Sequence, residues 1–425
     1  MDFILTCVYF GMLALLLQAV VLRVCAGQVA MQRRRTFFRL AALLWCAMAV
    51  AKKQYIDAII PPADALEHEA VAREVAELLT AGRYGEASSY STIGHGVYQC
   101  FVGLFYYLTG AEEVVVYAVN GALGFIGLLF LLDILCRHSN CQRLPASVVV
   151  VTALLPSGLL WTTSNLKEGV VLWGICAMLY LTAPASELAK RRSRLVPIAG
   201  LLAAAAVRPH IAAAWLAAIA AGAALDARRI GLFVATAGGA VVSVALVNYL
   251  APDLFALAMG EGVSATLSDR YSSLSTNEGL NGIALAGKNP VPVLSGLTLI
   301  LFRPWPFEVR DLNSLWVGME VWTLALLGFL SWRGTKSRLL LQPALMTHLF
   351  ALAALAFYFS YMYNMGLVVR QRLMCFPAVL FLYFYPAVAR QAARTAVPLR
   401  GGSRAVGTCR RFMRSRERTG LTQSR

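Results

Sequence analysis

The sequence predicts an all-α, polytopic integral membrane protein with about eleven transmembrane helices and further helices at the outer membrane face. Two observations lead to this prediction. The 425 residues are 59% hydrophobic and only 14% charged, whereas soluble globular chains carry about 25% charged residues. Several apolar runs reach roughly 18 residues or more, which is the length needed to cross a bilayer. We therefore expect one transmembrane domain over residues 1–390 and a basic tail over 391–425.

The first apolar run, residues 3–24, has no Lys or Arg before it and no small-residue cleavage site after it. We interpret it as a membrane helix and not as a signal peptide. Two shorter runs, 95–109 and 291–303, are expected to lie in the interface or to be re-entrant at the outer face, because a crossing by either alone would invert the charge pattern. The other expected crossings lie near 36–51, 112–136, 145–162, 167–185, 194–207, 211–227, 230–250, 312–332, 339–363 and 372–390.

The basic residues predict the orientation of the chain. The segments predicted to be cytoplasmic are 23–39, 137–143, 190–194, 228–229, 333–338 and the tail from 390, and they hold 26 of the 38 Lys and Arg residues. The outer side then has 12 bases and 18 acids. This asymmetry follows the positive-inside rule, with the N-terminus outside and the C-terminus in the cytoplasm. The same rule explains the net charge of +16 without nucleic acid, and the tail is expected to be disordered and to contact anionic lipid.

Candidate functional residues are the charged and polar side chains at outer helix ends, because charges at membrane depth are usually paired or functional. The outer loop 52–111 contains an amphipathic helix that starts near Pro61 and Pro62. Asp64, Glu67 and His68 near its start are alternative general bases. The other candidates are Lys167 and Glu168 in the polar outer turn 156–169, Arg208, His210, the loop 251–311 with Arg303 and Arg310, and finally Glu320, Asn364, Arg370 and Arg372.

Arg and Lys at these positions suit a phosphate or diphosphate group, because arginine grips phosphate through paired donors. No P-loop, dinucleotide-binding, HExxH or GxSxG motif is present. The nine cysteines include no CxxC pair and no Cys/His grouping with the spacing of metal ligands, so the sequence predicts no metal site.

Five segments resemble the GT-C class of membrane glycosyltransferases (family-39-like members) and related bacterial polysaccharide polymerases. The segments are ADALEHEAVAREVAELLTAGRYGE at 63–86, the stretch from His95 to Gly124, PSGLLWTTSNLKEG at 156–169, RPWPFEV at 303–309 and NMGLVVRQRLMCFPAVL at 364–380. The resemblance covers roughly residues 50–385. It implies a GT-C-like fold in the cytoplasmic (inner) membrane and a sugar donor linked to polyprenyl phosphate or diphosphate.

The resemblance implies sugar transfer at the outer membrane face during assembly of exopolysaccharide or another surface glycan. In that scheme Asp64 deprotonates the acceptor, and Lys167, Arg208, Arg303, Arg370 and Arg372 hold the donor phosphate. Members of the class differ in their use of a divalent metal. The partners expected are the lipid-linked sugar, a glycan acceptor, membrane lipid and other polysaccharide-assembly proteins.

Three alternatives stay open from the sequence. The enzyme either adds a single sugar or joins repeat units as a polymerase. A flippase or transporter of lipid-linked sugar would carry charges near mid-membrane and an internal repeat, and the charges here lie at outer ends, with Glu320 the nearest exception. A non-enzymatic assembly partner would not need so many arginines and acids on one face.

Overall fold

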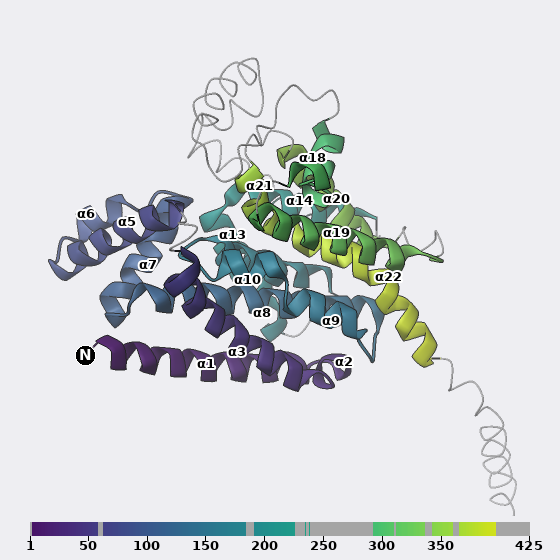
Figure 1. Ribbon diagram of the computed structural model, residues 1–425, viewed down its shortest axis with the longest axis horizontal. Helices are drawn as coiled ribbons and strands as arrows, with labels where there is room; N and C mark the ends of the chain where they lie inside the picture. The colour runs from purple at the N-terminus through teal and green to yellow at the C-terminus, as the bar shows by residue number, and fades with distance from the viewer. Residues whose placement is uncertain are drawn as a thin grey trace, which may run out of the picture.

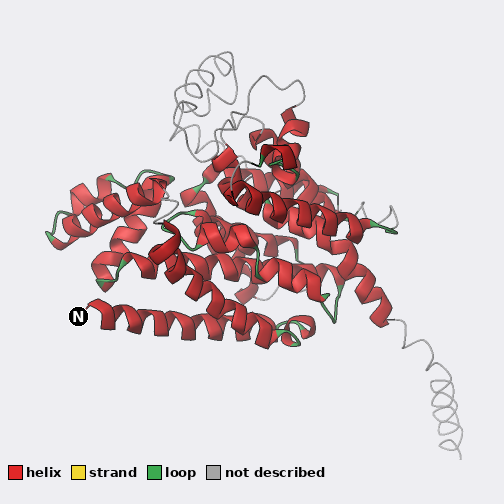
Figure 2. Ribbon diagram, in the orientation of Figure 1, coloured by secondary structure: helices red, strands yellow, loops and turns green. Residues whose placement is uncertain are grey.

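The computed structural model describes residues 2–57, 63–183, 191–225, 292–309, 312–335, 342–359 and 365–396, with the isolated residues 234 and 238. Every regular element in these ranges is a helix, and the all-α prediction is confirmed (Figure 2). The predicted crossing at 230–250 apart from residues 234 and 238, most of the loop 251–311 up to residue 291, and the tail from 397 lie outside the described residues.

The helices follow the predicted runs closely. The run at 95–109 is one helix with these bounds, and the predicted crossing at 145–162 is divided between two helices at Leu154 and Leu155. The elements are α1 (Asp2–Ala26), α2 (Val29–Gln32), α3 (Arg35–Ala51), η1 (Lys52–Ile56), α5 (Ala63–Thr80), α6 (Tyr84–Ser89), α7 (His95–Thr109), α8 (Glu113–Ser139), α9 (Ala146–Ala153), α10 (Pro156–Thr162), α11 (Glu168–Met178), η2 (Leu179–Thr182), α13 (Arg191–Val207), α14 (Pro209–Ala224), α18 (Pro292–Leu301), η4 (Pro306–Glu308), α19 (Leu312–Trp332), α20 (Pro343–Phe359), α21 (Met365–Gln371), η6 (Arg372–Met374) and α22 (Phe376–Ala396).

Three helices in the described part of the chain are long and apolar enough to cross a membrane, namely α1, α8 and α19. A fourth crossing is added if Val368–Met374 and Phe376–Thr395, which meet at a bend of 61°, form one broken span. The helices at 146–162, 168–182, 195–207, 209–224 and 343–359 are apolar but shorter. A membrane protein is therefore supported, while the count of about eleven crossings stays a prediction.

Helix α8 lies at the centre of the bundle and packs against α1, α3, α11 and α22. Glycines allow its neighbours to approach closely. A Cβ added at Gly169 of α11 would lie 2.4 Å from the Asn120 carbonyl oxygen of α8. Added at Gly121 or Gly124 of α8, it would lie 2.7 Å from Thr163 or Thr162. The polar turn after α10 is therefore pressed directly onto α8.

Several segments that are predicted to lie on opposite sides of the membrane are found at opposite ends of the molecule. In Figure 1 the N-terminus of α1 and helices α5, α6 and α7 lie at the left, while α2 and the last turns of α22 lie at the right. At the predicted cytoplasmic end, the Tyr385 hydroxyl donates to the His138 carbonyl oxygen at 3.3 Å, and Arg390 Nη1 donates to Thr335 Oγ1 at 2.7 Å. Which end faces outward stays a prediction from the charges.

Helices α5 and α7 pack against each other at the predicted outer end. Gly103 permits their contact, since a Cβ there would lie 2.7 Å from the Ala72 carbonyl oxygen. The opposite face of α7 is apolar and exposed, with Phe101 55% and Leu108 70% accessible. An amphipathic helix of this kind suits the membrane interface predicted for residues 95–109.

Candidate functional site

Four helices begin at one place in the structure. α5 begins at Ala63, α7 at His95, α11 at Glu168 and α14 at Pro209. Ion pairs and ring contacts link the residues at these starts. The first turn of a helix exposes backbone N–H groups and carries partial positive charge. Four such turns together make this end of the bundle suited to an anion.

The sequence explains why the helices begin here. Pro209 occupies the first position of α14, where its missing N–H is not needed. Glu168 occupies the first turn of α11, where a carboxylate is favourable. Gly94 precedes α7 with a φ of 101°, a backbone conformation that favours glycine. Its N–H donates to the Ala206 carbonyl oxygen at 3.0 Å, which ties the start of α7 to the end of α13.

The charged side chains at these starts form a continuous chain of ion pairs. Arg370 of α21 lies between two acids, with its Nη1 2.6 Å from Asp64 Oδ2 and its Nε 2.9 Å from Glu168 Oε1. Arg208 Nη2 donates to the same Glu168 oxygen at 3.1 Å. The predicted residues Asp64, Glu168, Arg208 and Arg370 are thus brought together from distant parts of the chain. We call these four, with Lys167, the outer charge cluster.

The outer charge cluster has more cations than acids. The Glu168 side chain is fully buried and holds two arginines, so it orients them and balances part of their charge. Lys167 is only 3% exposed and forms no ion pair with any described residue. Two arginines and the Lys167 amine therefore lie beside two carboxylates, and Arg208 Nε has no hydrogen-bond acceptor within the described residues. A buried excess of positive charge is costly without an anionic partner.

Asp64 is the carboxylate of the cluster that solvent can reach, with 42% of its side chain exposed. Partial burial raises its pKa, but the charge and hydrogen bond of Arg370, followed by the charges of His68 and His95, lower the pKa more. The net direction is downward, so Asp64 is ionised at neutral pH. An ionised and accessible carboxylate is able to accept a proton.

The two alternative bases differ from Asp64 in position and charge. Glu67 is exposed. His68 is buried, and its pKa is lowered to about 4 by burial first and then by the charge of Lys167, so it is neutral and weakly basic at neutral pH. Gln99 Nε2 lies 3.1 Å from His68 Nδ1, and as a donor it leaves the proton on His68 Nε2. Of the three candidates, Asp64 is the one that forms an ion pair within the outer charge cluster.

His95 was not found by sequence reasoning. Its ring lies 5.3 Å from that of His68. Burial, and then the charges of Lys167 and Arg208, lower its pKa to about 4. The available signal was a histidine directly after a glycine at the start of an apolar helix, which by itself has no chemical meaning.

A set of buried polar residues beside the cluster was also missed. Asn165 Nδ2 donates to Glu69 Oε2 at 2.9 Å, and the Tyr98 hydroxyl donates to Asn165 Oδ1 at 2.9 Å. Asn120 Nδ2 donates to the Tyr98 hydroxyl oxygen at 2.7 Å and to the Ser164 carbonyl oxygen at 2.8 Å. The polar turn that precedes Lys167 is thus hydrogen-bonded to α5, α7 and α8.

Three other predicted residues lie in a second, separate group. Arg372 is fully buried and donates from Nη1 to the Arg303 carbonyl oxygen at 2.8 Å. Arg303 forms an ion pair with Glu308. Glu320 accepts hydrogen bonds from the backbone N–H of Ser157, at 3.0 Å, and from the Ser157 hydroxyl. No hydrogen bond or ion pair joins Arg303 or Glu320 to the outer charge cluster in the part of the chain described.

His210 is the second residue of α14, and its ring lies 5.2 Å from that of Tyr358. Arg310 and Asn364 lie outside the described residues. Over the described ranges, no group of three or more His, Cys, Asp or Glu residues is placed to hold a metal ion.

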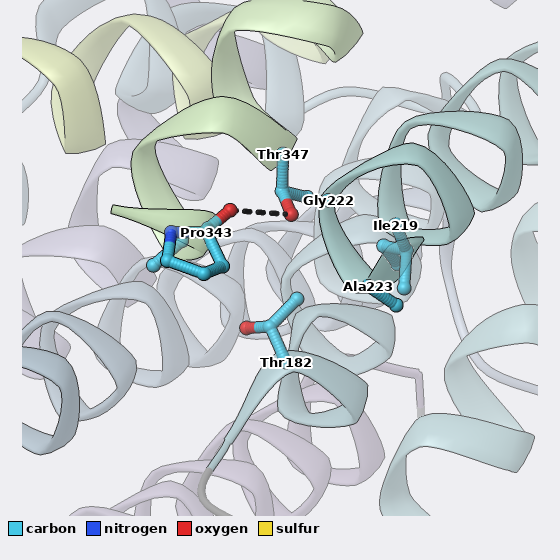
Figure 3. A pocket seen from close by; sticks show the side chains of 7 residues that line it. Thr182, Ile219, Gly222, Ala223, Pro343 and Thr347 are labelled. Carbon is cyan, nitrogen blue, oxygen red and sulfur yellow. Dashed lines mark hydrogen bonds between the residues drawn. The ribbon is translucent and has the colours of Figure 1, made fainter. Parts of the chain in front are cut away.

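A small cavity lies elsewhere, between η2, α14 and the start of α20 (Figure 3). Its lining has no charged side chain, and the Thr347 hydroxyl donates to the Pro343 carbonyl oxygen at 3.1 Å. Because no charged side chain lines it, the cavity lacks the groups needed to hold a phosphate. The helix ends around it are also predicted to be cytoplasmic.

Comparisons with known proteins give no further guide to the family. The chain matches no protein-family model, no curated protein and no solved structure.

Proposed function

We propose that the protein is a membrane glycosyltransferase that uses a sugar donor linked to polyprenyl phosphate or diphosphate. The observation that supports this proposal most is the outer charge cluster. It combines three cations, four helix starts and one accessible carboxylate. The cations match the phosphate of such a donor, and the carboxylate matches the base that the acceptor hydroxyl requires.

The proposed reaction uses each part of the cluster. Lys167, Arg208 and Arg370 bind the donor phosphate beside the helix starts. Asp64 accepts the proton of the acceptor hydroxyl as its oxygen bonds to the anomeric carbon. The bond from that carbon to the phosphate oxygen breaks, and the polyprenyl phosphate or diphosphate leaves with the electron pair. The three cations stabilise the negative charge that develops on this leaving group.

Glu168 has a supporting role in this reaction. Its carboxylate accepts from Arg208 and lies against Arg370, so both guanidinium groups are held before the donor arrives. Donors that are already in position cost no reorganisation at the moment of reaction. The proposal therefore treats Glu168 as a positioning residue and not as a ligand of the phosphate.

The apolar surfaces suit a donor that arrives through the membrane. Helix α7 begins beside His68 and has an exposed apolar face, and in the proposal a lipid-linked substrate contacts this face as it enters from the outer leaflet. In the proposal the protein lies in the inner membrane, contacts a glycan acceptor on the outer side, and works with other polysaccharide-assembly proteins. The additional helix α1 before the first outer loop favours a repeat-unit polymerase over the simplest single-sugar enzymes.

The proposal is tested in a deletion strain by measuring outer-surface polysaccharide. The strain is complemented with wild type, Asp64→Asn or Glu67→Gln at equal membrane levels. Glu67 is the matched control, because it is an exposed acid three residues further along the same helix. We expect wild type and Glu67→Gln to restore the polymer and Asp64→Asn to fail. Full complementation by Asp64→Asn would remove Asp64 as the base.

A second measurement separates an enzyme from a transporter or an assembly partner. The purified protein in lipid nanodiscs is incubated with the lipid-linked sugars extracted from the deletion strain, together with the glycan acceptor fraction. A glycosyltransferase releases polyprenyl phosphate or diphosphate only when the acceptor is present. Movement of the lipid-linked sugar across vesicles without its cleavage would instead identify a flippase.

A further inference from the structure

A chain of buried hydrogen bonds runs from α5 to the turn that carries Lys167. Glu69 of α5 accepts at the same oxygen, Oε2, from the Tyr106 hydroxyl at 2.5 Å and from Asn165 Nδ2 at 2.9 Å. Asn165 accepts from Tyr98, and Tyr98 accepts from Asn120. All of these residues are 9% exposed or less.

The direction of every bond in this chain is fixed by chemistry. An ionised carboxylate only accepts hydrogen bonds, so Asn165 must present its NH₂ group to Glu69. Its carbonyl oxygen then faces Tyr98, which must donate its hydroxyl proton. The Tyr98 oxygen is left to accept, and Asn120 supplies the donor. The acceptor oxygen of Glu69 thus sets the orientation of the two amides and the phenol.

The chain connects the two halves of the proposed site. Glu69 lies five residues after Asp64 on α5, and Asn165 lies two residues before Lys167. We propose that the chain Glu69–Asn165–Tyr98–Asn120 is a positioning device that holds the general base at a fixed distance from the phosphate-binding turn. This inference rests on the proposed glycosyl transfer.

The device has a kinetic consequence that a merely stabilising network lacks. None of its four residues forms an ion pair with Lys167, Arg208 or Arg370 among the described residues. Breaking the chain should leave the cations able to bind the donor phosphate. It should instead displace Asp64 relative to the bound sugar. Displacement of reacting groups by about 1 Å lowers rates by up to about a hundredfold.

The test compares Tyr98→Phe with Tyr90→Phe in purified protein in lipid nanodiscs. Tyr98→Phe removes only the hydroxyl that joins the two asparagines. Tyr90→Phe is the matched control, because its hydroxyl donates to Glu74 of the same helix α5 in an exposed pair at 2.6 Å. The readouts are kcat with extracted lipid-linked donor and acceptor, and the Kd for a long-chain polyprenyl phosphate alone.

We expect Tyr98→Phe to lower kcat by about tenfold or more with a Kd within twofold of wild type, and Tyr90→Phe to change neither. A pair of variants at Glu69 keeps the test independent of the folding of Tyr98→Phe. Glu69→Gln retains an oxygen that accepts from Asn165 and Tyr106, so it should keep most of the activity. Glu69→Ala removes the acceptor and should lose it.

Each outcome decides the inference. Wild-type kcat in Tyr98→Phe, or equal activity of Glu69→Gln and Glu69→Ala, would overturn it while leaving the proposed function in place. A loss of donor affinity that matches the loss of kcat would also overturn it, because the chain would then act on phosphate binding. Absence of transfer by the wild-type protein would refute the proposed function, and the inference with it.

Discussion

Asp64→Asn should abolish transfer and yet bind the donor lipid more tightly. In the structure Arg370 Nη1 lies 2.6 Å from Asp64 Oδ2, so this guanidinium group already has an anionic partner before any donor arrives. A phosphate that binds Arg370 has to compete with that carboxylate. Removing the negative charge removes the competitor, and it also removes repulsion between Asp64 and the phosphate.

The size of the effect follows from the exposure of the two side chains. Exposed ion pairs contribute about 0.2–1 kcal/mol, and hydrogen bonds to charged groups about 1.5–3 kcal/mol. The Arg370 side chain is 13% exposed and the Asp64 side chain is 42% exposed, which places this pair toward the weaker range. We take ~1 kcal/mol, which corresponds to about a fivefold lower Kd.

The assay is equilibrium binding of a long-chain polyprenyl phosphate to the protein in nanodiscs. Wild type, Asp64→Asn and Glu67→Gln are compared at the same ionic strength. Glu67→Gln removes an equal charge from the same helix at an exposed position, so its Kd should match that of wild type. Unchanged or weaker binding by Asp64→Asn would show that Arg370 does not receive the phosphate. An equal gain in both variants would mean that only the overall charge of α5 matters.

Three further predictions concern stability, each measured by thermal unfolding in detergent. Glu168→Gln leaves two buried arginines without their shared carboxylate and should destabilise the protein by about 3–5 kcal/mol. Because burial and then Lys167 lower the pKa of His68 from 6.5 to about 4, the unfolded chain takes up a proton first on acidification, and stability should fall as pH decreases from about 6.5 to about 4. The slope in this window should be smaller in His68→Gln, and an unchanged slope would mean that His68 does not contribute to it. Gly169→Ala should be strongly destabilising, because the added Cβ would meet the Asn120 carbonyl oxygen, whereas Gly85→Ala, with nothing within 4 Å, should be tolerated.

The sequence predicted the helices well, and several of the charged residues that it indicated lie together in the structure. Uncompensated charges beside apolar runs are easy to find, because each one carries a large cost at membrane depth. Asp64, Lys167, Glu168, Arg208 and Arg370 were all found in this way, and the structure brings them together. The pairing itself was not predictable. Which acid faces which arginine depends on how helices far apart in the chain pack.

The neutral polar residues were missed for a different physical reason. Asn120, Tyr98 and Asn165 are ordinary residues of helices and turns until their partners are known. Their importance comes from burial, where an unpaired amide or hydroxyl costs about 1–3 kcal/mol and a fully paired one is rigid. The separate location of Arg303 and Glu320 was equally hidden, since Arg370 and Arg372 are only two residues apart and their side chains reach different partners.

The turn TTSNLKE at 162–168 combines two requirements that a single residue type does not meet. Thr162 to Asn165 are completely buried against the glycines of α8. A buried segment needs its polar groups paired without net charge, and hydroxyl and amide side chains do this at low cost. Lys167, by contrast, is useful in the proposed reaction only because its charge has no ion-pair partner among the described residues. The neutral residues fix the turn so that the lysine beside them is held ready for an anion. This is why we expect substitutions in the neutral half to change the rate and substitutions of the lysine to change the affinity.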